Sequence, residues 1–508
     1  MYNQDSIIYI HTDEVEPLQI QSDLFEGRKR IAEIQQQHLK KPEVSIAILG
    51  YNRLEKTKRC VESVLKHTKG IDYELILIDN GSVDDTLEYF KQVPYEKKHI
   101  IRITKGMGTN YAWCWLSCVD IGPYFVFLAN DLVCTPNWLH NLLICIKSDE
   151  KIGMVNPVSS NVSNGQQVDL PFSNLEEMEW LAENYNQSDA RKWEEKLRLI
   201  TLGSLYRKEA LLSIGFPIFD VGFFHDFGDD DLSFRIRRNG YRLILAKDTW
   251  IHHDHDFRNY ENKTPEEYHA SVNIGRENFR EKYHGIDAWE DIYLDWEGSI
   301  RSIPLPILKR EVTVLGLDVK CGSSLLEIKN YLTANGISEI NLNAFVQDSK
   351  YREDLCSICN GTVVCDREDG IRFHFPRESY DYIILGRSIN TYTEPWVVLQ
   401  DLMDCLKQGG VLILSLENTM SYLEFLNMLG VRRKYREEIV YHIPYEMLVK
   451  QLQYYGEIIH ADICQENLSK EDREYLQNLW KNPYEIETKE ENFARFMAKN
   501  FVVMVRKS

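Results

Sequence analysis

The run Val44-Ser45-Ile46-Ala47-Ile48-Leu49 decides the fold of the first half of this sequence. It is apolar apart from one serine, and such a strand is expected in a parallel sheet that is covered by helices on both faces. An amphipathic segment from Leu54 to His67 follows, and the run Glu74-Leu75-Ile76-Leu77-Ile78, apolar after its first residue, comes after it. This alternation predicts βαβ units, with strands at 44–49 and 74–78 and a helix at 54–67.

A third apolar run, at 124–129, is followed directly by Asn130 and Asp131. Polar residues also follow the first two runs, at Asn52 and Asp79. Ligands of open α/β sheets collect beyond the carboxyl ends of the strands, so we expect these side chains to share one site. Asn and Asp are also preferred helix caps, which is the alternative interpretation for each residue. Three successive strand ends that carry Asn or Asp favour a functional site.

The length of 508 residues predicts two or three domains. Residues 1–42 are predicted to form an N-terminal extension, a short strand followed by a polar helix at 22–40. Residues 173–199 are predicted to be a helical insertion rich in Glu and Trp. Pro304 and Pro306 separate two differently patterned regions and place a boundary near residue 305. A second α/β pattern follows, so we predict two sequential α/β domains, at 43–304 and 305–508.

The composition excludes several classes of protein. The 78 acidic and 59 basic side chains leave a formal charge of −19, which argues against general nucleic-acid binding. The first residues lack the layout of a secretion signal, and no window has the length and apolarity of a membrane-spanning helix. Eleven scattered cysteines favour reduced thiols over a disulfide framework. These features predict a soluble, cytoplasmic protein with no nucleic-acid partner and no membrane span, and they leave its oligomeric state open.

The densest cluster of carboxylates is Asp229-Asp230-Asp231, which opens an amphipathic segment ending near Gly240. The partly positive amino terminus of a helix stabilises anions, which accounts for one or two of the three. The mutual repulsion of three carboxylates indicates that a cation or a proton-donating substrate shares the site. A carboxylate whose pKa is raised by such neighbours becomes a better general base near neutral pH.

About twenty residues later, His252-His253-Asp254-His255 forms another segment rich in metal ligands. If this segment is extended, His252 and Asp254 lie on one face, and His253 and His255 lie on the other. Imidazole and carboxylate together suit a divalent cation such as manganese. An exposed polar loop is the alternative interpretation.

Together these segments resemble the family 2 glycosyltransferases, whose GT-A fold transfers a sugar from a nucleotide diphosphate with inversion at the anomeric carbon. Residues 44–53 are similar to the family's first strand and donor-binding turn, and residues 78–86 to its DNGSxDDT segment. Residues 127–131 stand at its Asp-x-Asp metal motif, with Ala129 in place of the first Asp. The resemblance covers roughly residues 43–285.

The fourth matching motif, at residues 214–241, follows the family block GxFDExFxxxxEDxDLxxRxxxxGY, with Gly228 at the Glu position. The resemblance makes Asp229 the implied general base, with Asp230 as its rival because the alignment could slip by one residue. Asp131 and His252 are the implied ligands of a divalent metal, Mn²⁺ or Mg²⁺, and Asp79 is implied to hydrogen-bond the nucleoside base. The implied donor-binding residues are Tyr51, Asn52, Arg53, Asp79, Asn130 and Asp131.

Residues 312–324 resemble the VLDxGCGxG strand and loop of class I S-adenosylmethionine-dependent methyltransferases, and residues 380–386 and 399–415 resemble later motifs of that fold. Lys320 and Ser324 occupy positions where that family has Gly, and an acid for the cofactor ribose is not evident near Asn341–Asn343. These departures favour a degenerate domain that is silent or a scaffold over one that binds S-adenosylmethionine.

The leading hypothesis is a bacterial-type hexosyl- or N-acetylhexosaminyltransferase. Its expected donor is a UDP-linked sugar, with a dTDP-linked sugar as the alternative, and its expected acceptor is a hydroxyl of a polysaccharide, a lipid-linked glycan or a protein. The alternatives are a bifunctional glycosyl- and methyltransferase, and a nucleotide-sugar-binding scaffold without turnover.

Overall fold

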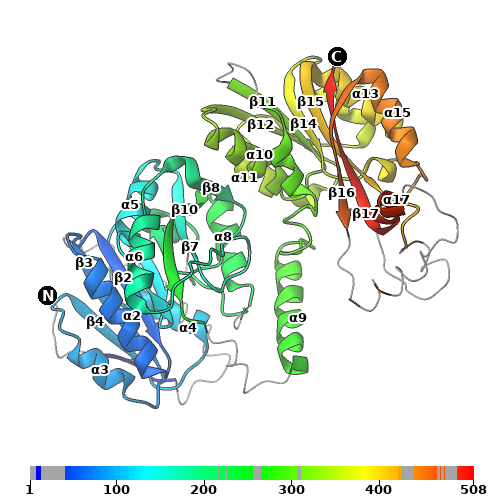
Figure 1. Cartoon of the computed structure of the whole chain (residues 1–508). Helices are drawn as coiled ribbons and strands as arrows, with labels where there is room; N and C mark the ends of the chain where they lie inside the picture. Colours follow the sequence, from blue (N-terminus) through cyan, green and yellow to red (C-terminus); the bar gives the residue numbers. More distant parts are fainter. Residues whose placement is uncertain are drawn as a thin grey trace. The chain divides into compact units, whose positions relative to one another are not determined.

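The structure is a computed structural model of the whole chain, and it forms two compact units, 1–288 and 289–508. Both units are α/β, as predicted (Figure 1). The helix predicted at 22–40 lies outside the described residues. The structure describes residues 7–12, 41–215, 217–223, 226–255, 265–305, 311–422, 424, 439–465, 470, 474 and 489–508.

The first unit is built on a mixed sheet, whose described strands run in the order β1-β4-β3-β2-β5-β9-β7-β10-β6, with β8 paired to β10. The strands are β1 (Ile7–Ile10), β2 (Val44–Gly50), β3 (Tyr73–Asn80), β4 (Lys98–Ile103), β5 (Tyr124–Ala129), β6 (Leu132–Val133), β7 (Ile152–Ser159), β8 (Trp193–Lys196), β9 (Ser204–Arg207) and β10 (Arg242–His253). The helices are α2 (Leu54–His67), α3 (Thr86–Gln92), α4 (Thr109–Cys114), α5 (Trp138–Lys147), α6 (Leu175–Tyr185), α7 (Lys208–Ser213), α8 (Gly228–Arg238) and α9 (Pro265–Lys282).

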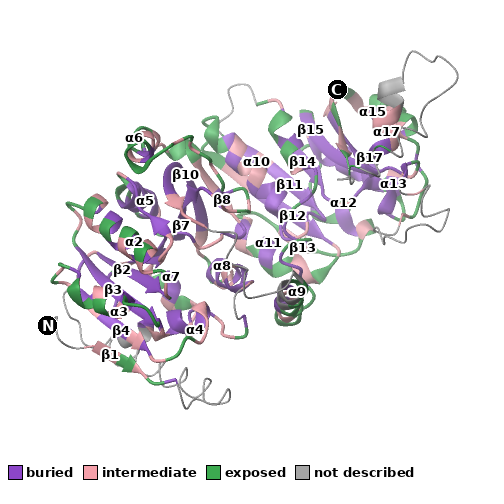
Figure 2. Ribbon diagram, turned by 60° about the horizontal axis from the view of Figure 1, so that its bottom comes forward, coloured by how far each residue is buried: buried purple, intermediate pink, exposed green. Residues whose placement is uncertain are grey.

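Strands β2, β3, β4 and β5 are parallel, and their carboxyl ends lie at one edge of the sheet. Gly50 is in register with Asp79, and Asp79 is in register with Arg102. Every residue of β2 and β3 is buried, as expected for strands covered on both faces (Figure 2). Helix α2 covers one face by burying Thr57, Cys60, Val61 and Val64, whose spacing of three and four residues makes one helical stripe.

The prediction of a helical insertion at 173–199 is confirmed for α6 but is wrong for residues 193–196. These residues form β8, which pairs antiparallel with residues 243–246 of β10. The indole N–H of Trp193 donates to the buried carboxylate of Asp248 at 2.7 Å. Pairing with β10 and this buried hydrogen bond override the local composition, which favours a helix.

The second unit contains a sheet whose described strands run in the order β13-β12-β11-β14-β15-β17-β16, in which β17 is antiparallel to both of its neighbours. The strands are β11 (Glu311–Leu317), β12 (Glu339–Val346), β13 (Val363–Cys365), β14 (Tyr380–Leu385), β15 (Leu406–Glu417), β16 (Gly456–Gln465) and β17 (Ala498–Lys507). The helices are α10 (Ser323–Ala334), α11 (Arg352–Ile358), α12 (Ile371–His374), α13 (Pro395–Cys405), α15 (Tyr445–Tyr455) and α17 (Lys489–Met497).

Residues 289–304 lie in the second unit, whereas the sequence analysis placed the boundary near 305. Arg301 pairs with Glu327 of α10 at 2.5 Å, and the hydroxyl of Ser299 donates to Asp462 of β16 at 2.9 Å. These long-range contacts, which no local pattern encodes, attach the segment to the second sheet. Among the helices that the structure describes, none has the length and apolarity needed to span a membrane.

Candidate functional site

The loops that follow β2, β3 and β5 are joined by hydrogen bonds at the carboxyl edge of the first sheet. The backbone N–H of Asn52 donates to Ser82 Oγ at 2.9 Å, and Asn52 Oδ1 accepts the backbone N–H of Val83 at 2.9 Å. The amide group of Asn130 donates to the backbone carbonyl of Asn52 at 3.1 Å. The structure therefore brings together the strand ends at which the sequence predicted a common site.

The turn between β2 and α2 is strained. Asn52 and Arg53 have φ values of 54° and 58°, in the left-handed region. Asn tolerates this conformation, whereas it costs a residue such as Arg roughly 1–2 kcal/mol. Strain of this kind persists at sites where a ligand is held. The side chains of Tyr51 and Arg53 are exposed and available to a ligand, with Tyr51 54% exposed and its ring close to Gly106.

Asp79 is fully buried behind this turn, and both of its carboxylate oxygens have partners. Oδ1 accepts the backbone N–H of Ser82 at 2.9 Å, and Oδ2 accepts from the guanidinium of Arg102. Arg102 also donates to the carbonyl of Ser82 at 3.0 Å. Asp79 thus holds the loop after β3, and Arg102, which the sequence analysis did not single out, neutralises its charge.

Asp131, His253 and His255 form a group that could hold a metal ion. Each offers one ligand atom, and these atoms lie within 4.8 Å of one another. Asp131 Oδ2 is 3.6 Å from His253 Nε2. His253 Nδ1 is 3.0 Å from the carbonyl oxygen of Asn161, so Nδ1–H donates to this carbonyl and Nε2 faces Asp131. Such an orienting hydrogen bond is typical of a histidine that ligates a metal.

The protonation states in this group suit a cation. Burial by itself raises the pKa of Asp131, but the nearby imidazoles of His253 and His255 hold the pKa below its ordinary value. Burial, followed by the influence of His253, lowers the pKa of His255. An ionised carboxylate and a neutral imidazole are the forms that bind a divalent cation. These residues therefore fit a metal.

His252 lies outside this group, on the opposite face of the extended segment. Its Nδ1 is 2.9 Å from Ser160 Oγ. Its ring lies against Trp250, with centroids 5.9 Å apart, and against Phe172, with centroids 5.2 Å apart. The structure places this predicted ligand in a packing position. The alternation of an extended segment separates His253 and His255 from His252, but it does not tell which of the two faces meets Asp131.

Asp254 also points away from Asp131. It forms ion pairs with Lys56 at 3.5 Å and with Arg59 at 2.8 Å. Both basic residues belong to α2, so these pairs attach the end of β10 to the helix that follows the first strand. The charge of Asp254 is therefore balanced by α2 rather than by the group around Asp131.

The three consecutive aspartates at the start of α8 have different partners. Asp229 Oδ1 accepts the hydroxyl of Thr201, and Asp229 is only partly buried. Asp230 is buried, and its Oδ1 lies 2.6 Å from Arg198 Nε. Burial raises the pKa of Asp230 to about 6, although Arg198 opposes this rise. Arg198 supplies one of the cations that the sequence analysis required.

The contact between Asp229 and Thr201 lies near the sheet edge. Two residues after Thr201, Gly203 packs so closely on the side chain of Ile251 that an added Cβ would lie 2.5 Å from it. The same Cβ would lie 3.5 Å from the side chain of Leu128. Ile251 is in β10 and Leu128 is near the end of β5, so the segment that carries Thr201 and Gly203 packs against these two strands.

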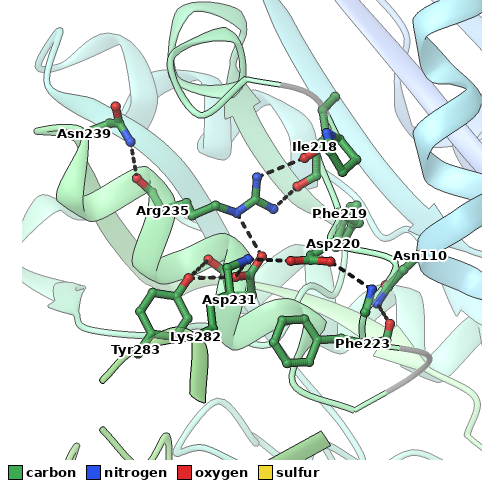
Figure 3. A network of polar contacts seen from close by, with 12 residues as sticks. Asn110, Ile218, Phe219, Asp220, Phe223, Asp231, Arg235, Asn239, Lys282 and Tyr283 are labelled. Carbon is green, nitrogen blue, oxygen red and sulfur yellow. Dashed lines mark hydrogen bonds and ion pairs between the residues drawn. The ribbon is translucent and has the colours of Figure 1, made fainter. Parts of the chain in front are cut away.

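Asp231 belongs to a buried polar network (Figure 3). Its carboxylate lies 2.8 Å from Arg235 Nε and 2.5 Å from Lys282 Nζ, and it accepts the hydroxyl of Tyr283 at 2.6 Å. Arg235 also donates to the carbonyl of Pro217 at 2.9 Å. This network joins α8 to the region of α9, so Asp231 has a structural role and its cations come from the chain itself.

Replacing Asp231 by Asn is expected to lower the free energy of unfolding by about 3 kcal/mol or more, because Arg235 and Lys282 lose their buried carboxylate. Asp220→Asn is the matched control, since Asp220 pairs with the same Lys282 at 2.6 Å but is one-third exposed. Its expected cost is at most about 1 kcal/mol. Calorimetric melting of both variants measures the difference. Equal melting shifts would contradict a structural role specific to Asp231.

In the second unit, the loop at 318–322 after β11 is hydrogen-bonded to other residues of the chain, and we call it the closed loop. Lys320 has a φ of 52°, a conformation that favours Gly, and Gly is what the methyltransferase pattern has there. Its Nζ donates to the carbonyl of Glu290 at 2.7 Å. The backbone N–H of Cys321 donates to the carbonyl of Asp291 at 3.3 Å. The carbonyl groups of residues 290 and 291 thus accept hydrogen bonds from the loop that a cofactor would approach.

The second strand of this unit, β12, ends at Val346, beyond the region where the sequence analysis sought an acid. Gln347 follows it, and both its backbone N–H, at 2.8 Å, and its side-chain amide, at 2.9 Å, donate to the carboxylate of Asp318. The hydroxyl of Tyr392 donates to the same carboxylate at 2.7 Å. These residues do not fit a nucleoside cofactor, because the amide Gln347 follows β12 where the cofactor ribose needs an acid, and the carboxylate of Asp318 is bonded within the chain.

Comparison with known proteins identifies a part of the first unit. Residues 45–215 match the family model Glycosyl transferase family 2, so this part of the chain is a domain of that family. The uncharacterized protein y4gI of Sinorhizobium fredii (strain NBRC 101917 / NGR234) is 32% identical over 106 residues, which are 20% of this chain. This match spans only 12% of that protein's length.

Two solved structures are similar at low identity. The mannosyltransferase PcManGT from Pyrobaculum calidifontis, in complex with GDP-Man and Mn²⁺, is 15% identical, with a TM-score of 0.34 over 62% of this chain and 80% of that chain. The CurJ carbon methyltransferase is 15% identical, with a TM-score of 0.27 over 41% of this chain and 51% of that chain.

Proposed function

We propose that the first unit is a metal-dependent, inverting glycosyltransferase that moves a sugar from a nucleoside diphosphate to a hydroxyl of an acceptor. The observation that carries this proposal is the convergence of Asp131, His253 and His255 at the carboxyl edge of a family 2 domain. The strained turn with the exposed side chains of Tyr51 and Arg53 lies at the same edge and supports a donor site there.

Asp229 is the proposed general base. It is only partly buried and accepts a hydroxyl, whereas Asp230 is buried against Arg198 and Asp231 is held by Arg235 and Lys282. Asp229 takes the proton of the acceptor hydroxyl while that oxygen attacks the anomeric carbon. The bond between this carbon and the diphosphate oxygen breaks on the opposite side, which inverts the configuration and releases the nucleoside diphosphate.

Asp131, His253 and His255 are the proposed ligands of a divalent metal. When bound, the cation supplies positive charge that stabilises the departing diphosphate. Two imidazoles and one carboxylate suit Mn²⁺ better than Mg²⁺, which prefers oxygen ligands. We further propose that Asp79, which is buried and bonded to Ser82 and Arg102, holds the loop that contacts the nucleoside base. We also propose that Tyr51, Asn52, Arg53 and Asn130 line the donor side, and that the donor is UDP-linked.

The test is consumption of nucleotide sugars by the full chain. A panel of UDP-, GDP- and dTDP-linked sugars is incubated with the protein and Mn²⁺, and the released nucleoside diphosphate is measured by chromatography. We expect release from at least one donor, loss of release with EDTA, and its recovery with Mn²⁺ in excess. Absence of both release and thermal stabilisation by every donor would contradict the proposal.

For the second unit, we propose a silent or scaffolding role. The closed loop at 318–322 supports this role over methyl transfer. Calorimetric titration of the full chain with S-adenosylmethionine is therefore expected to give no binding heat. Binding at micromolar concentrations would overturn this role and favour the bifunctional alternative. A cytoplasmic location stays a prediction from the sequence.

A further inference from the structure

The second unit contains a cavity of about 340 Å³ at the carboxyl end of β15. Its walls are the loop 418–420 after β15, the start of α15, the end of α17 and Phe501 of β17. The volume lies at the lower end of the range for small-molecule sites. The residues that line the cavity do not include the closed loop at 318–322, so this cavity is separate from the cofactor position discussed above.

Aromatic rings form one side of the cavity. The rings of Tyr445 and Phe501 have centroids 4.6 Å apart and are tilted by 36°, and Phe496 adds a third ring to the lining. Large aromatic side chains provide apolar faces that pack against the C–H groups of a ligand ring. The side chain of Met420, which is 77% exposed, adds another apolar group to the lining.

The charged groups narrow the class of ligand. Glu417 is buried in the lining, where its Oε1 accepts from Ser388 Oγ at 3.5 Å. Glu446 is exposed and lies 2.8 Å from Arg495, so two carboxylates accompany one guanidinium. This balance disfavours a phosphate or another anion. The guanidinium of Arg495 lies over the ring of Tyr445, 5.4 Å from its centroid, in the position that an organic cation would need. A neutral ligand is therefore favoured.

A sugar ring matches both sets of groups. Each hydroxyl is a donor and an acceptor, so it can donate to the carboxylates of Glu417 and Glu446 and accept from Arg495. The C–H faces of the same ring can pack against the aromatic side chains. We propose that this cavity binds one neutral sugar ring, and that the ring belongs to the glycan which the first unit extends. The assignment of the ring to this glycan rests on the proposed function, whereas the binding of a sugar ring to the cavity does not.

The test is saturation-transfer NMR on the full chain in EDTA, without nucleotide. The probes are methyl glycosides of glucose, galactose, mannose, rhamnose, N-acetylglucosamine and N-acetylgalactosamine. At least one glycoside is expected to give a signal, which Arg495→Gln and Tyr445→Leu each reduce by tenfold or more. The matched control is Arg506→Gln, which removes a partly exposed arginine that pairs with Glu457 at 3.3 Å and should leave the signal unchanged.

Asp131→Ala is a second control, because it alters the first unit and should not change the signal. Melting temperatures establish that each variant is folded. Absence of a signal from every glycoside, or an undiminished signal in both cavity variants, would overturn the proposal. Sugar binding, when no nucleotide sugar is consumed and none raises the melting temperature, would support the cavity and contradict the proposed function. Consumption of a nucleotide sugar without binding of any glycoside would contradict the cavity alone.

Discussion

Asp229→Asn is expected to lower kcat for sugar transfer at least a hundredfold, because an amide cannot take the proton of the acceptor hydroxyl. The hydroxyl of Thr201 can donate to the amide oxygen as it does to the carboxylate, so the fold should persist. Initial rates with the best donor of the panel measure the effect. KM for the donor should change little, since Asp229 acts on the acceptor.

Asp230→Asn is the matched control, and it also carries a test of stability. The folded pKa of Asp230 is about 6, above the ordinary value of 3.8, so the fold favours the neutral acid. Below about pH 4 the carboxylic acid of the wild type and the amide of the variant are both uncharged. The two proteins should then have the same melting temperature. Above about pH 6 the wild type holds a buried charge, so the variant should be more stable by roughly 3 kcal/mol.

The two variants distinguish the rival bases. We expect Asp230→Asn to retain at least a tenth of the wild-type transfer rate, because the side chain is buried against Arg198 rather than open to an acceptor. Loss of transfer in Asp230→Asn with retention in Asp229→Asn would show that Asp230 is the base. A melting difference that is independent of pH would contradict the charge state assigned to Asp230.

His253→Ala is expected to weaken Mn²⁺ binding at least a hundredfold, because it removes a ligand whose orientation is fixed by Asn161. Asp131→Ala should have an effect at least as large, since it removes the charged ligand. The measurement is the free Mn²⁺ signal in electron paramagnetic resonance during titration of the full chain, which needs no donor sugar.

The control for this series is His252→Ala. His253 faces Asp131, whereas the ring of His252 packs against Trp250 and Phe172. This variant should bind Mn²⁺ within a few-fold of the wild type, although it can lower the melting temperature. Loss of Mn²⁺ in His252→Ala together with retention in His253→Ala would support the ligand implied by the family resemblance. It would contradict the ligand set Asp131, His253 and His255 that the geometry indicates.

Much of the fold could be predicted because its signals are local. The apolar runs at 44–49, 74–78 and 124–129 each became a strand whose side chains are buried on both faces or nearly so. Parallel strands bring their carboxyl ends to one edge, so the polar residues after them were expected to meet there. The alternation in the His-rich segment also separated its two faces, but the sequence could not say which face meets Asp131.

The remaining features depend on contacts between distant residues. Arg198 pairs with Asp230, and Arg102 pairs with Asp79, without any signal in the sequence around either residue. Strand β8 forms because β10 offers an edge, although the local composition favours a helix. The closed loop of the second unit depends on Glu290 and Asp291, which precede it by about thirty residues and fall within the domain that the sequence analysis assigned to the first fold.

The central claim is that the first unit holds a divalent ion where Asp131, His253 and His255 converge. Anomalous diffraction from crystals grown with Mn²⁺ and a nucleoside diphosphate tests it directly. We expect one strong manganese peak within bonding distance of Asp131 and His253, with the diphosphate against it. A structure with the nucleotide bound and no manganese at these residues, or with manganese held by His252, would contradict the claim.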